Sequence, residues 1–292
     1  MHVSHQGNID VNMTDHLHRT ALQWAIHGGH GKLATLLLLQ PKIHADATGK
    51  FNRSPLALAA HAGNARIVRL LVRDHNVDNN ATDKQFRTPL HYAAHFGHKK
   101  VADILIGHPL TAINVTERMN RSALHLAAYS NHEKIVGKLL RHKQIKLNNR
   151  NAFGETPLFN AASRGNLLVL EMLLKAKNIE LNIQDRHGDT ALIIACKKDQ
   201  YEIVVSLLAH KEVALNKQNL QGFSAVMCAA SNGNLAIVNL LLADSRTNVG
   251  LVNTHQKTAV VIARSRHHLR VADALQVHAQ STEKQGISAG AQ

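Results

Sequence analysis

The segment RTPLHYAAHFGH, residues 87–98, carries the pattern that decides the fold. Thr88 is a suitable helix N-cap, and Pro89 follows at the first helical position, where the missing amide hydrogen costs nothing. The two alanines in the middle of the segment allow a neighbouring helix to approach closely. Gly97 is a suitable residue to end this helix because glycine readily adopts a positive φ angle. The segment therefore predicts a short helix followed by a tight turn.

The same pattern recurs every 34 residues along the chain. A hydroxyl residue stands at Thr20, Ser54, Thr88, Ser122, Thr156, Thr190, Ser224 and Thr258. Alanine follows five positions later at Ala25, Ala59, Ala93, Ala127, Ala161, Ala195, Ala229 and Ala263. Leucine follows seventeen positions after each hydroxyl, at Leu37, Leu71, Leu105, Leu139, Leu173, Leu207, Leu241 and Leu275. Agreement at three positions in eight copies predicts a solenoid of stacked repeats.

The rest of each unit predicts a second helix and a hairpin. Ile67, Val68 and Leu71 illustrate the apolar stripe of the second helix, at the 3.6-residue period. A short extended piece then ends in asparagine, at Asn80, Asn114, Asn148, Asn182 and Asn216. A turn such as DRHG (185–188) leads to the next N-cap. The seventh repeat has Gly250 in place of the asparagine, so we expect its last hairpin to be irregular.

Three segments resemble the T-P-L-H-x-A and G-H signature of ankyrin repeats: RTPLHYAAHFGH (87–98), RSALHLAAYSNH (121–132) and ETPLFNAASRGN (155–166). The tetratricopeptide pattern, which also runs 34 residues, is absent because Trp24 is the chain's single tryptophan. The resemblance covers about residues 3 to 278. It implies an all-α ankyrin-repeat solenoid, with helix-turn-helix plus hairpin in each of eight repeats and a single elongated domain.

The repeat register also predicts the boundaries along the chain. Residues 1–19 match only a hairpin half-repeat and are expected to cap the stack, and residues 20–278 form the eight repeats. Residues 279–292 are polar and are expected to form a flexible tail. The lengthened connection after each second helix is similar to that of ankyrin proteins from bacteria and protists.

Composition excludes several classes of protein. Of 292 residues, 45% are apolar and 3% aromatic, and the formal net charge is +14. No apolar run reaches the roughly 18 residues of a membrane span. The start, MHVSHQGNIDVN, lacks the basic and apolar stretches of a secretory signal. Two cysteines exclude a disulfide scaffold and fit a reducing compartment, so we expect a cytoplasmic protein.

Motifs for catalysis are absent from the sequence. It contains no phosphate-binding loop, nucleophile elbow or metalloprotease pair, so we expect neither an enzyme nor a cofactor. Cys196 and Cys228 fall on first helices and are expected to be buried core residues. His91, His95 and His98 fall at nearly helical spacing that would suit a metal. The resemblance instead implies that histidines such as His91 and His98 tie neighbouring repeats together, so no metal is expected.

In ankyrin proteins the first helices and hairpin tips line a concave face where partners bind, and the resemblance therefore implies a site there. The exposed residues of the first helices follow the two small residues. They include His27, His61, His95, Phe96 and Tyr129, and later Arg164, Lys197 and Lys198. Since neighbouring helices pack about 8–10 Å apart, we expect one continuous ladder with an exposed aromatic anchor. The alternative is that three histidines coincide by chance on a freely varying surface.

A second ladder stands directly before the N-caps: Arg19, Arg53, Arg87 and Arg121, followed by Glu155 and Asp189. The arginines place positive charge along the hairpin edge, or alternatively stack on the neighbouring hairpin. Residues 20–155 hold 19 basic and 8 acidic side chains and 12 of the 22 histidines. This distribution predicts one basic binding surface that mild acidification would charge further.

We therefore expect a monomeric, non-enzymatic scaffold that binds a protein partner on its concave face, with an acidic segment at the basic half. The alternative is binding of nucleic acid or another polyanion, from the sequence pI near 10. Against it, the chain lacks an interleaved aromatic and basic platform. A bare stack of this style is also similar to effectors that intracellular bacteria deliver into host cells.

Overall fold

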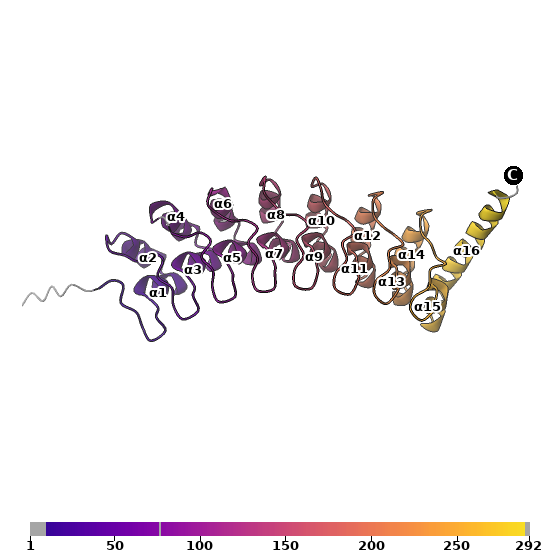
Figure 1. Ribbon diagram of the computed structural model, residues 1–292, viewed down its shortest axis with the longest axis horizontal. Helices are drawn as coiled ribbons and strands as arrows, with labels where there is room; N and C mark the ends of the chain where they lie inside the picture. Colours follow the sequence, from indigo (N-terminus) through magenta and orange to yellow (C-terminus); the bar gives the residue numbers. More distant parts are fainter. Residues whose placement is uncertain (1–9, 76, 290–292) are drawn as a thin grey trace, which may run out of the picture. The chain divides into compact units, whose positions relative to one another are not determined.

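The structure is a computed structural model that describes residues 10–75 and 77–289 (Figure 1). Within these residues the chain forms sixteen α-helices and no strand, which confirms the expected all-α solenoid. The helices come in pairs, as the repeat pattern predicts. The sequence predicts a single elongated domain, and the contacts group into two compact units, Met1–Lys146 and Leu147–Gln292, each of which is described by itself.

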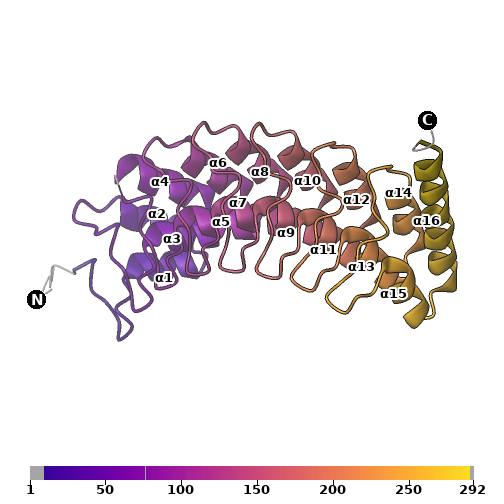
Figure 2. The ribbon, with the colours of Figure 1, turned by 45° about the vertical axis from the view of Figure 1, so that its right-hand side comes forward.

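The two units are built alike. The first contains α1 (Ala21–His27), α2 (Gly31–Leu38), α3 (Pro55–His61), α4 (Ala65–Asp74), α5 (Pro89–Phe96), α6 (Lys99–Gly107), α7 (Ala123–Tyr129) and α8 (Glu133–Leu140). The second contains α9 (Pro157–Arg164), α10 (Leu167–Leu174), α11 (Ala191–Lys197), α12 (Tyr201–Leu208), α13 (Ala225–Asn232), α14 (Leu235–Leu242), α15 (Ala259–Ser265) and α16 (Leu269–Ala289). Within each unit, odd-numbered helices pack on odd-numbered ones and even-numbered helices on even-numbered ones, as two layers (Figures 1 and 2).

The helix ends follow the predicted signals. Each odd-numbered helix begins after the recurring Ser or Thr; the Ser54 hydroxyl, for example, accepts a hydrogen bond from the Ala57 N–H at 3.2 Å. The turn glycines all adopt a positive φ angle, at Gly29, Gly63, Gly97, Gly165 and Gly233. Where the glycine is replaced, Asn131, Asp199 and His267 adopt the same left-handed conformation. The turn geometry is therefore common to all eight repeats.

Alanine and leucine fill the interior. The alanine five positions after the N-cap is buried in all eight repeats, with at most 2% of its surface exposed. On the even-numbered helices, Leu71, Leu105 and Leu139 are fully buried, and each such leucine contributes about 1.5–3 kcal/mol. Cys196 and Cys228 are buried as expected, and burial raises the pKa of the Cys228 thiol to about 12. Small residues thus lie between neighbouring odd-numbered helices and allow them to pack closely, while leucines fill the space between the two layers.

A closed turn precedes every odd-numbered helix except α3, whose turn has Gly49 at the corresponding position. In the third repeat the Asp83 N–H donates to the Arg87 carbonyl at 3.1 Å, and the Asp83 carboxylate accepts from the N–H groups of Gln85 and Arg87 at 2.8 and 2.9 Å. Successive turns are joined by one backbone bond, for example Leu220 N–H to the His187 carbonyl at 3.0 Å. Residues that take the position of Asp83 are Asp15, Glu117, Asn151, Asp185, Asn219 and Asn253.

The recurring asparagines clamp one repeat to the next. The Asn182 amide donates to the Glu212 carbonyl at 2.7 Å, and its carbonyl oxygen accepts from the Ala214 N–H at 2.8 Å. The same two bonds are made by Asn12, Asn80, Asn114, Asn148 and Asn216. Each clamp reaches 30 and 32 residues along the chain, which explains why asparagine recurs at the end of the extended piece.

We expect Asn182→Ala to lower the free energy of unfolding by about 1–3 kcal/mol, because it removes two hydrogen bonds between repeats. Urea denaturation followed by circular dichroism measures the loss. Asn239→Ala is the matched control, since Asn239 is an exposed residue within α14. Equal stability of the two variants would contradict the clamp.

Two expectations need correction. The last hairpin is regular, because Asn253 occupies the turn position, its N–H donates to the Lys257 carbonyl at 3.1 Å, and Gln256 takes the positive φ angle. The predicted flexible tail is helical backbone up to Ala289, as part of α16. Alanine, glutamine, glutamate and lysine are good helix formers, and no proline interrupts this segment. Residues 290–292 of the tail and 1–9 of the half-repeat lie outside the described residues.

Candidate protein-interaction surface

The predicted ladder lies on the odd-numbered helices of the first unit. His27, His61, His95 and Tyr129 are exposed at the C-terminal ends of α1, α3, α5 and α7. These four helices pack on one another in order, so the four side chains occupy equivalent positions on one layer. We call this surface, together with Phe96, the odd-helix face.

Phe96 is the centre of an aromatic cluster on this face. Its ring is 45% exposed and lies edge-to-face with His61 at 4.8 Å and with His95 at 4.7 Å between ring centroids. It also stacks on His98 at 6.0 Å, and His61 contacts Tyr92 at 5.5 Å. An exposed aromatic ring held by its neighbours presents apolar area at little cost in side-chain entropy, as anchor residues of interfaces do.

Backbone contacts hold the histidines of this cluster in place. The imidazole of His98 donates from Nε2 to the His61 carbonyl at 2.9 Å, and that of His132 donates to the His95 carbonyl at 3.1 Å. In the buried layer below, His91 donates from Nε2 to the Arg121 carbonyl at 3.0 Å. The implied role of these histidines in tying neighbouring repeats together is confirmed, and it sets them apart from the exposed ladder.

The pKa values of two ladder histidines, His61 and His95, are lowered. Burial lowers the pKa of His61, and nearby cations, Arg53 first among them, lower it further. Burial and Arg87 have the same effect on the pKa of His95. These two imidazoles are therefore protonated at a lower pH than usual, which runs against the expectation that mild acidification would charge this half.

Two of the predicted arginines surround the hydroxyl end of this cluster. The guanidinium carbons of Arg53 and Arg87 lie 5.6 and 6.0 Å from the centre of the Tyr92 ring. The Tyr92 hydroxyl donates to the Asp83 carboxylate, and burial and this hydrogen bond raise the Tyr92 pKa. Arg53 Nε lies 3.9 Å from the same carboxylate. The buried Asp83 carboxylate thus lies near the half-buried Arg53, and Arg87 lies near the Tyr92 ring that donates to it.

The other two arginines of the ladder are paired within their own turns. Arg19 lies 2.9 Å from Asp15, and Arg121 lies 2.9 Å from Glu117, whose carboxylate is nearly buried. Burial raises the Glu117 pKa, but hydrogen bonds and charge from Arg121 outweigh it and lower the pKa overall. The charge of the arginine ladder is therefore partly neutralised, which the sequence analysis did not anticipate.

The predicted residues of the second unit lie at the ends of α9 and α11. Arg164 and Lys198 are exposed, whereas Lys197 is half-buried and its ammonium lies 2.6 Å from the Asp189 carboxylate. Asp189 also accepts from the Asn219 amide at 2.8 Å. Lys197 is thus engaged in a local ion pair.

Sequence reasoning missed Tyr92, Trp24 and the turn acids. The acids were detectable, because Asp15, Asp83 and Glu117 recur at the 34-residue spacing, five residues before each N-cap. Trp24 and Tyr92 occupy the same position, four residues after the N-caps of the first and third repeats, Thr20 and Thr88. The Trp24 ring lies under Arg19 of the preceding turn, and the Tyr92 ring lies under Arg53 of the turn one repeat earlier. Only the fold shows these pairings.

Within the described residues no helix is both long and apolar enough to cross a membrane. The same residues hold no group of three or more histidine, cysteine or carboxylate side chains placed to bind a metal ion.

Paired helices joined by left-handed turns and stacked through hairpins define a helical repeat protein. The family model for ankyrin repeats matches residues 3–83, 56–151, 124–219 and 198–285. The chain therefore belongs to the ankyrin repeat family, as the signature segments indicated. Members of this family are generally non-enzymatic modules for protein–protein interaction. A comparison with curated proteins finds no match.

Proposed function

We propose that the chain is a scaffold that captures a protein partner through the odd-helix face, and that the partner contributes an acidic segment. The observation that carries this proposal is the exposed Phe96 ring, which three histidine rings hold in place, and one of these, His95, lines a small cavity with the half-buried Arg87. An apolar anchor with an arginine nearby complements a segment that mixes apolar and acidic residues.

The location of the charge supports an acidic partner. The first four repeats hold most of the excess of basic residues, whereas residues 156–189 hold four basic and four acidic side chains. Electrostatic complementarity of this kind mainly increases the rate of association and the discrimination between partners. We also propose, from the style of the hairpins, that the scaffold acts in the cytoplasm of its own cell or of a host cell.

A variant with His61, His95, Phe96 and Tyr129 changed to alanine tests the proposal. We expect its affinity for acidic peptides on an array to fall at least about tenfold, because removing exposed anchors costs more than about 1 kcal/mol each. Thermal stability should change little, since all four side chains are exposed.

Arg69→Ala, Lys100→Ala and Lys134→Ala together form the matched control. These exposed residues lie on α4, α6 and α8, so the control removes three positive charges from the other layer. Loss of binding in the control alone would show that net charge, not the odd-helix face, attracts the peptides. Retention of a DNA oligonucleotide at near-physiological salt, with a steep decline as salt rises, would favour the polyanion alternative and overturn the proposal.

A further inference from the structure

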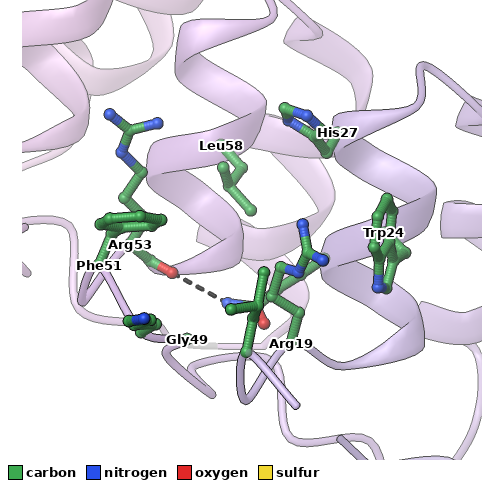
Figure 3. A pocket seen from close by; sticks show the side chains of 10 residues that line it. Arg19, Trp24, His27, Gly49, Phe51, Arg53 and Leu58 are labelled. Carbon is green, nitrogen blue, oxygen red and sulfur yellow. Dashed lines mark hydrogen bonds between the residues drawn. The ribbon is translucent and has the colours of Figure 1, made fainter. Parts of the chain in front are cut away.

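A half-open cavity of about 210 Å³ lies beside the odd-helix face, between the first two repeats (Figure 3). Its walls come from the turns before α1 and α3 and from the two helices themselves. The residues that line it include Arg19, Trp24, Lys50, Phe51, Arg53 and Leu58. Figure 3 shows Phe51 and Arg53 on one side, Trp24 and Arg19 on the other, and Leu58 between them. We call this cavity the Trp24 pocket.

Two hydrogen bonds fix the distance between the walls. The Gln23 amide donates to the Arg53 carbonyl at 2.9 Å, drawn as the dashed line in Figure 3. The Lys50 N–H donates to the Leu17 carbonyl at 3.0 Å. Because these bonds join α1 and the turn before it to the turn before α3, the pocket is formed before any ligand arrives.

Trp24 is held rigidly although 46% of its surface is exposed. The guanidinium of Arg19 lies over the indole at 3.8 Å, and the indole N–H donates to the Asp15 carboxylate at 3.0 Å. Asp15 also pairs with Arg19, which completes a closed triangle of contacts. An aromatic ring that is already immobilised loses little entropy when a ligand packs on it.

The size and lining of the pocket select one apolar side chain. Phe51 is 60% exposed and stands opposite Trp24, with Leu58 between them. The volume is smaller than the roughly 300–1,000 Å³ of a small-molecule site. It exceeds the roughly 150 Å³ of an apolar cavity that binds benzene. A single aromatic or large aliphatic side chain of a peptide therefore fits.

The rim of the pocket selects a carboxylate. Lys50 and Arg53 line it, whereas no carboxylate does, and Asp15 neutralises Arg19. Arg53 is incompletely paired, because its buried Nε has no hydrogen-bond partner among the described residues and lies 3.9 Å from Asp83. The Arg53 guanidinium and the His27 ring both lie at the upper rim in Figure 3. Guanidinium groups bind carboxylates through two parallel hydrogen bonds.

We propose that the Trp24 pocket receives one aromatic or large aliphatic side chain of an acidic peptide, and that Arg53 and Lys50 bind a carboxylate next to that side chain. This inference rests on the proposed function and specifies where and how an acidic partner is anchored. The carboxylate belongs to a neighbouring glutamate or aspartate, or to the C-terminus of the peptide.

The chain provides its own reporter, since Trp24 is its only tryptophan. The full chain is titrated with the acetylated and amidated peptide Glu-Glu-Phe-Glu-Glu while tryptophan emission is recorded. We expect a saturable change in emission, and at least about tenfold weaker binding when alanine replaces phenylalanine or lysine replaces glutamate in the peptide. Equal binding of the lysine peptide would overturn the proposal.

Phe51→Ala and Arg53→Gln should each weaken this binding about tenfold. Phe153→Ala is the matched control, because Phe153 holds the same place in its repeat, is 49% exposed and does not line the pocket. A second probe, a peptide with a C-terminal phenylalanine, is tested as the free acid and as the amide. Tighter binding of the free acid assigns the carboxylate to the peptide terminus, and equal binding assigns it to a side chain.

The two proposals fail in different ways. If acidic peptides bind without changing Trp24 emission, and Phe51→Ala binds as wild type while the four-alanine variant does not, the pocket proposal is overturned and the odd-helix face stands. If the four-alanine variant also binds as wild type, both proposals are overturned.

Discussion

Lowering the pH from 7 to 4 is expected to reduce the free energy of unfolding by about 3 kcal/mol through His91 alone. Burial lowers the pKa of His91 to about 4, against an ordinary value near 6.5. Below pH 6.5 the unfolded chain therefore binds a proton that the folded chain does not. The contribution of neutral His91 to the free energy of unfolding has its full value above pH 6.5. It is lost progressively as the pH falls toward 4.

The hydrogen bonds of His91 explain why it stays neutral. Its Nδ1 accepts from the Thr88 N–H at 3.1 Å, and its Nε2 donates to the Arg121 carbonyl at 3.0 Å. A proton on Nδ1 would face the Thr88 N–H and remove that bond. The ring is only 2% exposed, so water cannot replace the bond.

His91→Gln isolates this contribution, because the chain already contains the replacement. Gln23 holds the same position in the first repeat: its Oε1 accepts from the Thr20 N–H at 3.0 Å and its amide donates to the Arg53 carbonyl at 2.9 Å. We expect the free energy of unfolding of His91→Gln at pH 7 to lie within about 1 kcal/mol of the wild-type value. Each hydrogen bond of His91 has a counterpart made by a neutral glutamine. At pH 4 the difference should shift by about 3 kcal/mol in favour of the variant.

Denaturant titrations of both proteins at several pH values between 7 and 4 measure the difference. The carboxylates and the remaining histidines are common to the two proteins, so their contributions cancel. A difference that stays constant over this range would show that His91 is not held neutral in the folded chain.

The fold was predictable because each repeat encodes it locally. The N-cap, the buried alanine and the turn glycine are each defined by a few neighbouring residues, and 34-residue repetition repeats the first two eight times and the glycine five times. Asn253 shows the limit of this reasoning. The turn NTHQ lacks the glycine of DRHG, yet its asparagine supplies the carbonyl oxygen that accepts from the N–H groups of His255 and Lys257. The acceptor therefore fixes the turn more strongly than the glycine does.

The candidate site was predictable in position but not in charge. The register correctly placed His61, His95 and Phe96 on one exposed layer. It could not show that Arg19 stacks on Trp24, because that contact depends on side-chain conformations in the turn. It also could not show which arginines remain available. Pairing with a turn acid neutralises Arg121, whereas Arg53 follows Gly49, which provides no carboxylate in its own turn.

Gly188→Ala is expected to lower the free energy of unfolding by about 3 kcal/mol or more. Gly188 has a φ angle of +79°, which costs an L-residue about 1–2 kcal/mol. An added Cβ would also lie 2.7 Å from the Leu220 nitrogen and 3.0 Å from the Asn219 Cα, in the backbone of the next turn. Forcing an extra carbon into such a contact costs about 1–3 kcal/mol more, because backbone cannot rotate away.

Gly165→Ala separates the two costs within the same unit. Its φ angle is +70°, but the added Cβ would meet only the flexible side chain of Gln200, which can move aside. We therefore expect Gly165→Ala to lose only the conformational part, about 1–2 kcal/mol. Urea denaturation compares the two variants, and amide exchange at Leu220, whose N–H donates to the His187 carbonyl, locates the damage. If both variants lose the same stability and Leu220 stays protected, the close approach of successive turns contributes nothing. If Gly188→Ala loses more, packing between turns stabilises the stack beyond the conformation of each turn.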